Sequence, residues 1–160
     1  MYLNLLASAM NQNTAKNAHP AFVEIIKQLS AEEIILLDHI LKSSGIPMIE
    51  IRTKDKDKSN FYIEERNLID IHAGNPMKRV EDSNVCYQID NWVRLGLISS
   101  GFDKKLAGDD SYSWIQERPE YKRIKEVADK NGREVTYERG YIEKTSLGAQ
   151  FARVVGIIKS

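Results

Sequence analysis

Histidine and cysteine are the side chains in this sequence that could support catalysis or metal binding. The three histidines are His19, His39 and His72, and no two of them have the i, i+4 spacing of a helical metal-binding pair. Cys86 is the only cysteine, and no histidine or lysine lies close to it in the sequence to activate the thiol. We therefore interpret Cys86 as a packed thiol and His39 as a histidine at the edge of the core.

Two pairs of neighbouring carboxylates, Asp109-Asp110 and Glu64-Glu65, have the residue types of an acid and a base. Side chains of adjacent residues point apart, so solvation in loops is the better interpretation of both pairs. The sequence also lacks a glycine-rich phosphate loop and the G-x-S-x-G pattern of a nucleophile elbow. We expect no catalytic residue, no cofactor and no metal site, and hence a protein that is not an enzyme.

Charge is balanced along the whole chain. Among its 160 residues, Lys plus Arg number 23 and Asp plus Glu number 23. No basic half is present that would attract a nucleic acid, so nucleic-acid binding is not favoured. It stays open as an alternative if basic residues from separate segments meet in space. These residues are Lys54, Lys56, Lys58, Lys78 and Arg79.

Composition favours a globular protein in a reducing compartment. A hydrophobic share of 42% is enough for a core, and 29% of the residues are charged. No apolar run approaches the roughly 18 residues of a membrane span, and the start MYLNLLASAM lacks the positive charge of a signal peptide. A single cysteine excludes an intrachain disulfide. We expect a cytoplasmic protein without membrane contact.

The elements that would position these side chains begin with a helical N-terminal region, residues 1–45. A short helix is expected around Leu3, Leu6 and Met10, and Pro20 opens a second one. Ser30 and Glu33 form a capping box at the start of a strongly apolar third helix. Residues 46–53 then alternate as a half-buried strand, 54–60 form a loop, and 61–73 are ambiguous between strand and helix.

The strongest helical pattern is in VCYQIDNWVRLGLI, residues 85–98. Val85, Ile89, Trp92 and Val93 recur at helical spacing on a helix expected at 80–95, and Gly96 ends it before a short apolar strand at 97–98. Further along, 134–137 and 141–143 are expected to form a hairpin around Arg139-Gly140, followed by a helix capped by Thr145 or Ser146.

Helix, strand, hairpin and closing helix, in this order, predict a winged-helix outline. We therefore expect one α+β domain over residues 1–160. It would consist of the helical N-terminal region (residues 1–45) and a winged-helix-like region (residues 46–160), with a helical insertion at about 99–132 in which Pro119 begins a helix. A fold of this kind does not determine a function.

The C-terminal segment is a candidate interaction surface. Val154, Val155, Ile157 and Ile158 make it apolar on all sides. One side can pack on the core, and the other needs a cover. An unknown protein partner or a second copy of the chain would provide that cover. The alternative is burial against the N-terminal helices.

Several segments resemble the Abi-alpha (abortive infection alpha) family of bacterial domains. They occur in the family's order and are LLASAM (5–10), HPAFVEIIKQLS (19–30), PMIEIR (47–52), IDNWVRLGLI (89–98), RPEYKRIKEV (118–127) and RGYIEKTSLGAQF (139–151). The resemblance implies an α+β domain with winged-helix character and a link to phage defence or mobile elements. It implies no catalytic residues.

From this resemblance we expect a non-enzymatic protein-interaction component of a bacterial phage-defence system. The alternative is a winged-helix regulator that binds nucleic acid. Members of the family often carry additional sequence ahead of this region, whereas Tyr2-Leu3 lie almost at the first expected helix. We therefore expect a short member or an excised domain.

Overall fold

The computed structural model describes residues 21–73, 78–79 and 84–158, and it confirms an α+β fold. Its helices are α3 (Ala21–Lys27), α4 (Ala31–Lys42), α5 (Val85–Arg94), the 3₁₀ helix η1 (Asp109–Glu117), α6 (Pro119–Lys130) and α7 (Ser146–Val154). Its strands are β1 (Ile46–Asp55), β2 (Phe61–Ile69), β3 (His72–Ala73), β4 (Lys78–Arg79), β5 (Ile98–Gly101) and β6 (Arg133–Lys144).

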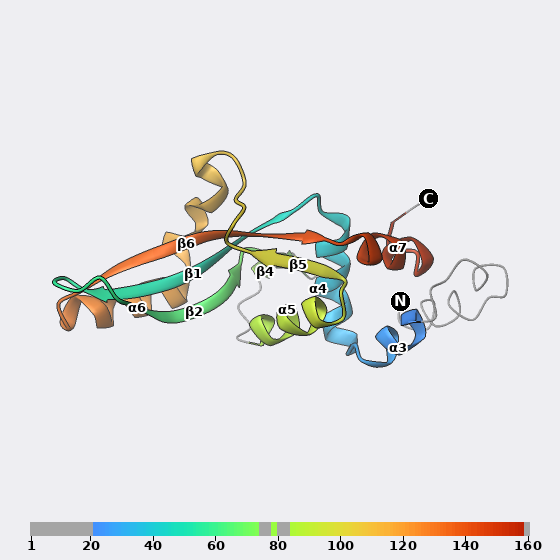
Figure 1. The fold of residues 1–160 in the computed structure, drawn as a ribbon, viewed down its shortest axis with the longest axis horizontal. Coiled ribbons are helices and arrows are strands. Elements are labelled where there is room, and N and C mark those ends of the chain that lie inside the picture. The colour runs from blue at the N-terminus through green and yellow to red at the C-terminus, as the bar shows by residue number, and fades with distance from the viewer. Residues whose placement is uncertain (1–20, 74–77, 80–83, 159–160) are drawn as a thin grey trace.

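The main sheet is antiparallel and has the strand order β2-β1-β6-β5. Its centre is a ribbon of β1 and β6, which pair without interruption from Ile46–Ile142 to Asp55–Arg133. Figure 1 shows these two strands running along the longest axis of the molecule. The ambiguous segment 61–73 forms strands β2 and β3, and β3 pairs with β4. Because β2 is the first strand in the order β2-β1-β6-β5, it lies at an edge of the main sheet.

Strand β6 shows that the predicted hairpin is wrong. Segments 134–137 and 141–143 belong to one continuous strand, and Arg139-Gly140 makes no turn. Gly140 has a different role, because a Cβ there would lie 2.7 Å from the Gly101 carbonyl oxygen and 2.7 Å from the Phe102 ring. The missing side chain lets the end of β5 approach β6 closely. Without this hairpin the predicted wing is not formed by these residues, and the winged-helix outline is not confirmed.

The helical N-terminal region is confirmed from α3 onward. Ser30 and Glu33 form the predicted capping box, with Glu33 N donating to Ser30 Oγ at 3.2 Å and Ser30 N donating to Glu33 Oε2 at 2.8 Å. The predicted helix around Leu3, Leu6 and Met10 lies outside the described residues. No helix within the described ranges combines the length and the apolar character needed to cross a membrane.

Segments far apart in the chain meet at the C-terminal end of α4. Lys144 Nζ, at the end of β6, donates to the carbonyl oxygens of Leu41 and Ser43 at 3.1 and 2.8 Å. A cation at this position complements the negative end of the helix dipole. Thr145 caps α7 as predicted, because its Oγ1 accepts a hydrogen bond from Gly148 N at 2.9 Å.

The larger hydrophobic cluster, here called the helical core, lies between one end of the sheet and helices α3, α4, α5 and α7 (Figure 1). Trp92, Phe22 and Phe151 are its largest fully buried side chains. The Phe22 and Phe151 rings meet edge to face, with their centroids 5.5 Å apart. Aromatic pairs in this geometry add to the stability that burial supplies.

Helix α5 contributes its predicted apolar face to the helical core. Val85, Ile89 and Trp92 are buried, whereas Val93, predicted on the same face, is 39% exposed. The predicted start at residue 80 lies outside the described residues. Gly96 follows the helix with a φ of 72°, a left-handed conformation that suits glycine and ends the helix where the pattern predicted.

A smaller cluster, here called the sheet core, lies on the opposite face of the sheet under η1 and α6. Its buried residues are Ile49, Ile51, Leu68, Tyr112, Trp114, Ile115 and Ile124. Both covering helices come from the predicted insertion at 99–132, and α6 begins at Pro119 as predicted. Ile49 faces the sheet core while Met48 faces the helical core, so β1 is buried on both faces and not half-buried.

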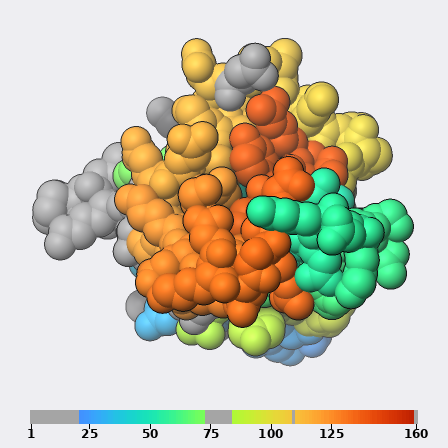
Figure 2. Space-filling view, turned by 90° about the vertical axis from the view of Figure 1, so that its left-hand side faces the viewer, coloured from blue at the N-terminus to red at the C-terminus, as the bar shows by residue number. Residues whose placement is uncertain are grey.

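The far end of the sheet is open to solvent along β2. Figure 2 looks onto this end, where the β1–β2 turn (green) projects beside α6 and the start of β6 (orange). Phe61, Tyr62 and Ile63 at the start of β2 are 48%, 46% and 38% exposed. An edge strand therefore begins with an exposed apolar run.

Candidate functional site

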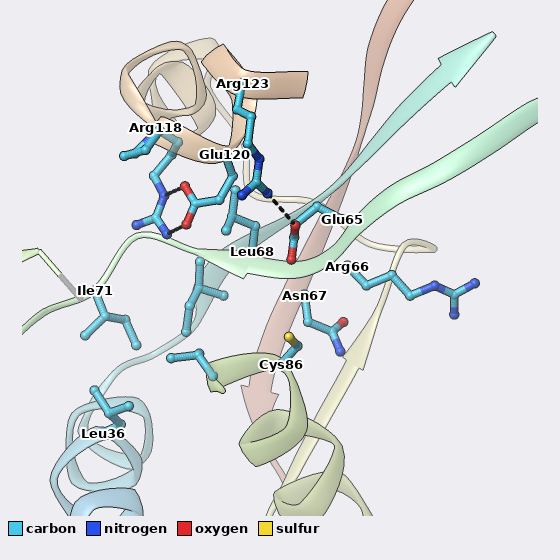
Figure 3. Close-up of a pocket in the computed structure, with 13 residues that line it drawn as sticks. Leu36, Glu65, Arg66, Asn67, Leu68, Ile71, Cys86, Arg118, Glu120 and Arg123 are labelled. Atoms are coloured by element: carbon cyan, nitrogen blue, oxygen red, sulfur yellow. Dashed lines mark hydrogen bonds and ion pairs between the residues drawn. The ribbon is translucent and has the colours of Figure 1, made fainter. Parts of the chain in front are cut away.

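A cavity of about 420 Å³, here called the β2 pocket, opens between β2, α5 and the start of α6 (Figure 3). Part of its lining is apolar and consists of Leu36, Leu68, Ile69, Ile71 and Val85. Polar and charged side chains line the rest, namely Glu65, Arg66, Asn67, Cys86, Arg118, Glu120 and Arg123. A cavity of this size and mixed lining suits a small organic molecule.

The polar side of the β2 pocket depends on an irregular stretch of β2. Its pairing with β1 shifts register between Ile49 and Ile51, and again between Ile51 and Arg52. Asn67 lies opposite the first shift and has a φ of 53°, which residues other than glycine rarely adopt. Its Nδ2 donates to Asp90 Oδ1 of α5 at 3.1 Å. Bulges redirect side chains, and this one directs polar groups of β2 toward α5 and α6.

Arg118 and Glu120 form a closed ion pair where α6 begins. Arg118 Nε and Nη2 donate to Glu120 Oε2 and Oε1 at 3.0 and 2.8 Å. Only 2% of Arg118 is exposed, and Pro119 between the two residues fixes the first turn of the helix. A bidentate pair of this kind holds both side chains in one geometry. It therefore acts as a fixed wall of the pocket.

Glu65 is held less firmly than Glu120. Its Oε2 lies 3.7 Å from Arg123 Nη2, which is an ion-pair distance but too long for a hydrogen bond. The Arg123 side chain is 70% exposed, whereas that of Glu65 is 25% exposed. Burial raises the pKa of the Glu65 carboxyl above its usual value, and the charge of Arg123 opposes this shift. Glu65 is thus a partly desolvated carboxylate whose negative charge is only weakly balanced by Arg123.

Cys86 lies below Glu65 in Figure 3. Burial raises the pKa of the Cys86 thiol, and the Glu65 carboxylate raises it further. A thiol with a raised pKa stays protonated at neutral pH and is a poor nucleophile. This favours the interpretation of Cys86 as a packed thiol.

The neighbouring carboxylates Glu64 and Glu65 line different hollows, in agreement with the expectation that they point apart. Both lie in strand β2, so their interpretation as residues solvated in a loop is wrong. Glu64 Oε1 accepts a hydrogen bond from Thr53 Oγ1 at 2.5 Å and lines a separate hollow of about 240 Å³ beneath α6. Within the stretches of the chain that the structure describes, no group of three or more His, Cys, Asp and Glu side chains could hold a metal ion.

The predicted basic residues fall into two separate groups. Lys54 and Lys58 lie beside the β1–β2 turn and form ion pairs with carboxylates at 3.0 and 2.9 Å, and Lys56 is exposed in that turn. Lys78 and Arg79 make up β4. Figure 1 places β4 near the middle of the molecule, away from the turn at the end of the sheet. The structure does not bring the five residues together.

The C-terminal residues predicted as an interaction surface do lie together. Val154 ends α7, Val155 is buried, and Ile157 and Ile158 follow after Gly156. Val154, Ile157 and Ile158 are partly buried and pack against the helical core. Much of the apolar surface of this segment is therefore used inside the fold, and its role in binding a partner stays a prediction.

Sequence reasoning missed the β2 pocket because its charged residues come from distant segments. Glu65 belongs to β2, whereas Arg118 immediately precedes α6 and Arg123 lies within it. They meet only because α6 packs beside β2. One local signal was available: Asn67 follows three charged residues inside a strand, and asparagine tolerates left-handed backbone better than most residues.

Comparison with known proteins adds a family. The model of the abortive infection alpha family matches residues 1–155. Among solved structures, the chain is similar to an uncharacterized protein from the hydrocarbon-degrading marine bacterium Alcanivorax borkumensis SK2. The identity is 10%, the match covers 92% of this chain and 97% of that chain, and the TM-score is 0.48. A search of curated proteins found no match. Because the family match extends over almost the whole sequence, the chain belongs to the abortive infection alpha family.

Proposed function

We propose that this chain is a non-enzymatic protein-interaction module of a bacterial phage-defence system, that it acts in the cytoplasm, and that it binds its partner along β2. The family's description as abortive infection alpha supports the defence role. The observation that carries the binding mode is the free edge of β2, which begins with exposed apolar side chains. The partner would add an extended segment to the sheet.

The backbone of β2 is available for such an addition. β2 pairs with β1 on one side, and no described residue forms a backbone hydrogen bond to its other side. An edge strand offers a row of N–H and C=O groups as a template for another strand. Protein domains that bind extended peptides use such edges, and pockets for alternate side chains give the specificity.

The side chains at the start of β2 indicate the chemistry of the partner. Phe61 and Ile63 project from one face of the sheet and Tyr62 from the other. The Arg52 guanidinium lies 4.2 Å from the centre of the Phe61 ring, and that of Arg133 lies 4.6 Å from the centre of the Tyr62 ring. These cation–π contacts hold both rings in position on the surface. The partner segment should therefore carry apolar residues on both of its faces.

Charges around these rings are paired with one another. Arg52 lies within 3.0 Å of Glu50 and of Glu138, and Lys54 is 3.0 Å from Glu134. Clustered unpaired cations are what phosphate contacts require. The alternative, a regulator that binds nucleic acid, therefore has less support than recognition through backbone and apolar contacts.

Selection from a displayed library of random peptides on the whole chain tests this binding mode. We expect enriched peptides with consecutive apolar residues, which lie on both faces of an extended segment, and at least a tenfold loss of their affinity for the double variant Phe61→Ser/Ile63→Ser. Ile35→Ser is the matched control, since Ile35 is an apolar residue of α4 that is 55% exposed, and α4 lies at the other end of the sheet from the start of β2 (Figure 1). It should leave binding unchanged.

Three outcomes would contradict the proposal. Peptides could bind the double variant as well as the wild type, or the amides of β2 could show no added protection from hydrogen exchange in the complex. Saturable binding of labelled random-sequence duplex DNA that weakens steeply between two salt concentrations would instead support the nucleic-acid alternative. For the defence role, phage plating on a bacterial host that produces the chain should be reduced, and the double variant should restore it.

A further inference from the structure

We infer that the β2 pocket binds a small organic cation, an amine or amidinium with an apolar body, whose charged head contacts Glu65. This site is lined by residues 65–69 in the second half of β2 and not by the exposed residues at its start, and it would give the module a small-molecule ligand in addition to a protein partner. Three features of the pocket carry the inference. The negative charge of Glu65 is only weakly balanced, the Arg123 side chain beside it is largely exposed, and part of the pocket wall is apolar.

The Glu65 carboxylate lacks the partners that a desolvated anion needs. Its side chain is 25% exposed, its ion pair with Arg123 spans 3.7 Å, and no described residue donates a hydrogen bond to it. Removing a carboxylate from water is unfavourable unless charged donors replace the lost hydration. An ammonium or amidinium group at hydrogen-bonding distance would supply them.

Arg123 can leave Glu65 with little loss of stability. Its side chain is 70% exposed, and ion pairs of this kind contribute little in water. The other arginines of the lining form no ion pair with this carboxylate, and the charge of Arg118 only lowers its pKa from a distance. Arg118 is engaged by Glu120 in two hydrogen bonds, and the guanidinium of Arg66 points away from Glu65 in Figure 3. An incoming cation would therefore displace a single weak contact.

The apolar wall selects an organic cation over a bare metal ion. Leu36, Leu68, Ile71 and Val85 line the cavity beside the charged residues. Hard metal ions require several oxygen ligands. No group of three or more candidate ligands exists in the described ranges. A volume of about 420 Å³ is enough for a charged head and a ring or short alkyl body.

Three probes of nearly the same shape but different charge test the inference: benzamidine, benzamide and benzoate. Binding to the whole chain is measured by ligand-observed NMR at pH 7 and moderate salt. We expect saturable binding of benzamidine in the millimolar range, at least tenfold weaker binding of benzamide, and no binding of benzoate. A fragment of this size cannot be expected to bind much more tightly.

The variants Glu65→Gln and Glu64→Gln separate the site from a general effect of charge. Both remove one negative charge from adjacent residues, but Glu64 lines the hollow beneath α6. Glu65→Gln should weaken benzamidine binding at least tenfold, and Glu64→Gln should leave it unchanged. Equal loss in both variants, unchanged binding to Glu65→Gln, binding of benzoate, or no saturable binding of benzamidine would each overturn the inference.

Discussion

The two ends of the β1–β6 ribbon differ in how they are covered. At one end, α3, α4, α5 and α7 enclose the helical core around Trp92. At the other end, η1 and α6 cover the sheet core on one face, and the start of β2 stays exposed. In our proposal, the enclosed end supplies most of the stability, and the open end supplies the surface that binds the partner. Substitutions at the two ends should therefore differ in what they change.

Trp92→Ala should have the largest effect on stability. The side chain is fully buried in the helical core, so its loss should lower the free energy of unfolding by about 3–5 kcal/mol. Urea denaturation measures this value. Trp92→Phe is the control and should be milder, since Trp92 Nε1 is buried with no hydrogen-bond partner among the described residues. A shift in Tm of a degree or less for Trp92→Ala would show that the helical core does not depend on this residue.

Gly140→Ala should have an intermediate effect, because it acts where the ribbon meets β5. The new Cβ would lie 2.7 Å from the Gly101 carbonyl oxygen, so the strands must separate. Overpacking of this kind lowers the free energy of unfolding by about 1–3 kcal/mol. Chemical denaturation of the variant checks the value. An unchanged midpoint would mean that β5 is free to move away from β6.

Glu65→Gln should change stability only slightly, and in a pH-dependent way. Burial raises the pKa of Glu65 in the folded protein, so between the usual and the raised pKa the folded state binds more protons than the unfolded state. Stability therefore falls as pH rises through this window, and charged Glu65 is mildly destabilising at neutral pH. Glu65→Gln should raise the free energy of unfolding at pH 7 by less than about 1 kcal/mol, since the group is partly exposed.

The gain from Glu65→Gln should disappear when the pH is lowered below the usual carboxyl pKa of about 4.3. Denaturation curves of wild type and variant at pH 7 and at the lower pH make the comparison. A gain that is the same at both pH values would show that the charge of Glu65 is not its cause.

Phe61→Ser/Ile63→Ser should also have only a small effect on stability, within about 0.5 kcal/mol per substitution, because both side chains are exposed. Equilibrium unfolding of the double variant tests this directly. The same variant should lose the binding of the selected peptides, whereas Trp92→Phe should retain it. If instead the double variant unfolds as readily as Trp92→Ala, the start of β2 contributes to the core and the two ends do not differ as described.

Local signals in the sequence predicted the helices well. The capping box of Ser30 and Glu33, Pro119 at the start of α6, and Thr145 at the start of α7 act within a few residues, so they can be recognised without the rest of the fold. The alternating apolar pattern likewise predicted a strand at 46–53, within β1.

Interactions between distant segments explain what the sequence did not show. Arg139-Gly140 has the composition of a turn, but β1 pairs along the whole of β6 and keeps these residues in a strand. Both faces of β1 are buried because η1 and α6 fold back over the sheet. The β2 pocket depends on the same packing of α6, so neither Glu65 nor Arg123 stands out in the sequence. Local patterns carry no information about such contacts.

The late position of β6 in the chain has a consequence for folding during synthesis. Lys144 hydrogen-bonds to carbonyl groups 103 and 101 residues earlier, and β1 finds its partner β6 across a similar separation. Pairing of such distant segments is slow compared with helix formation. Synthesis proceeds at about 5–20 residues per second, so β6 is made on the order of 5–20 seconds after β1. During this time Ile49 and Ile51 of β1 lack the neighbouring strand β6. The four-stranded sheet is therefore completed late, after the segments of α3, α4, α5 and α6 have been made.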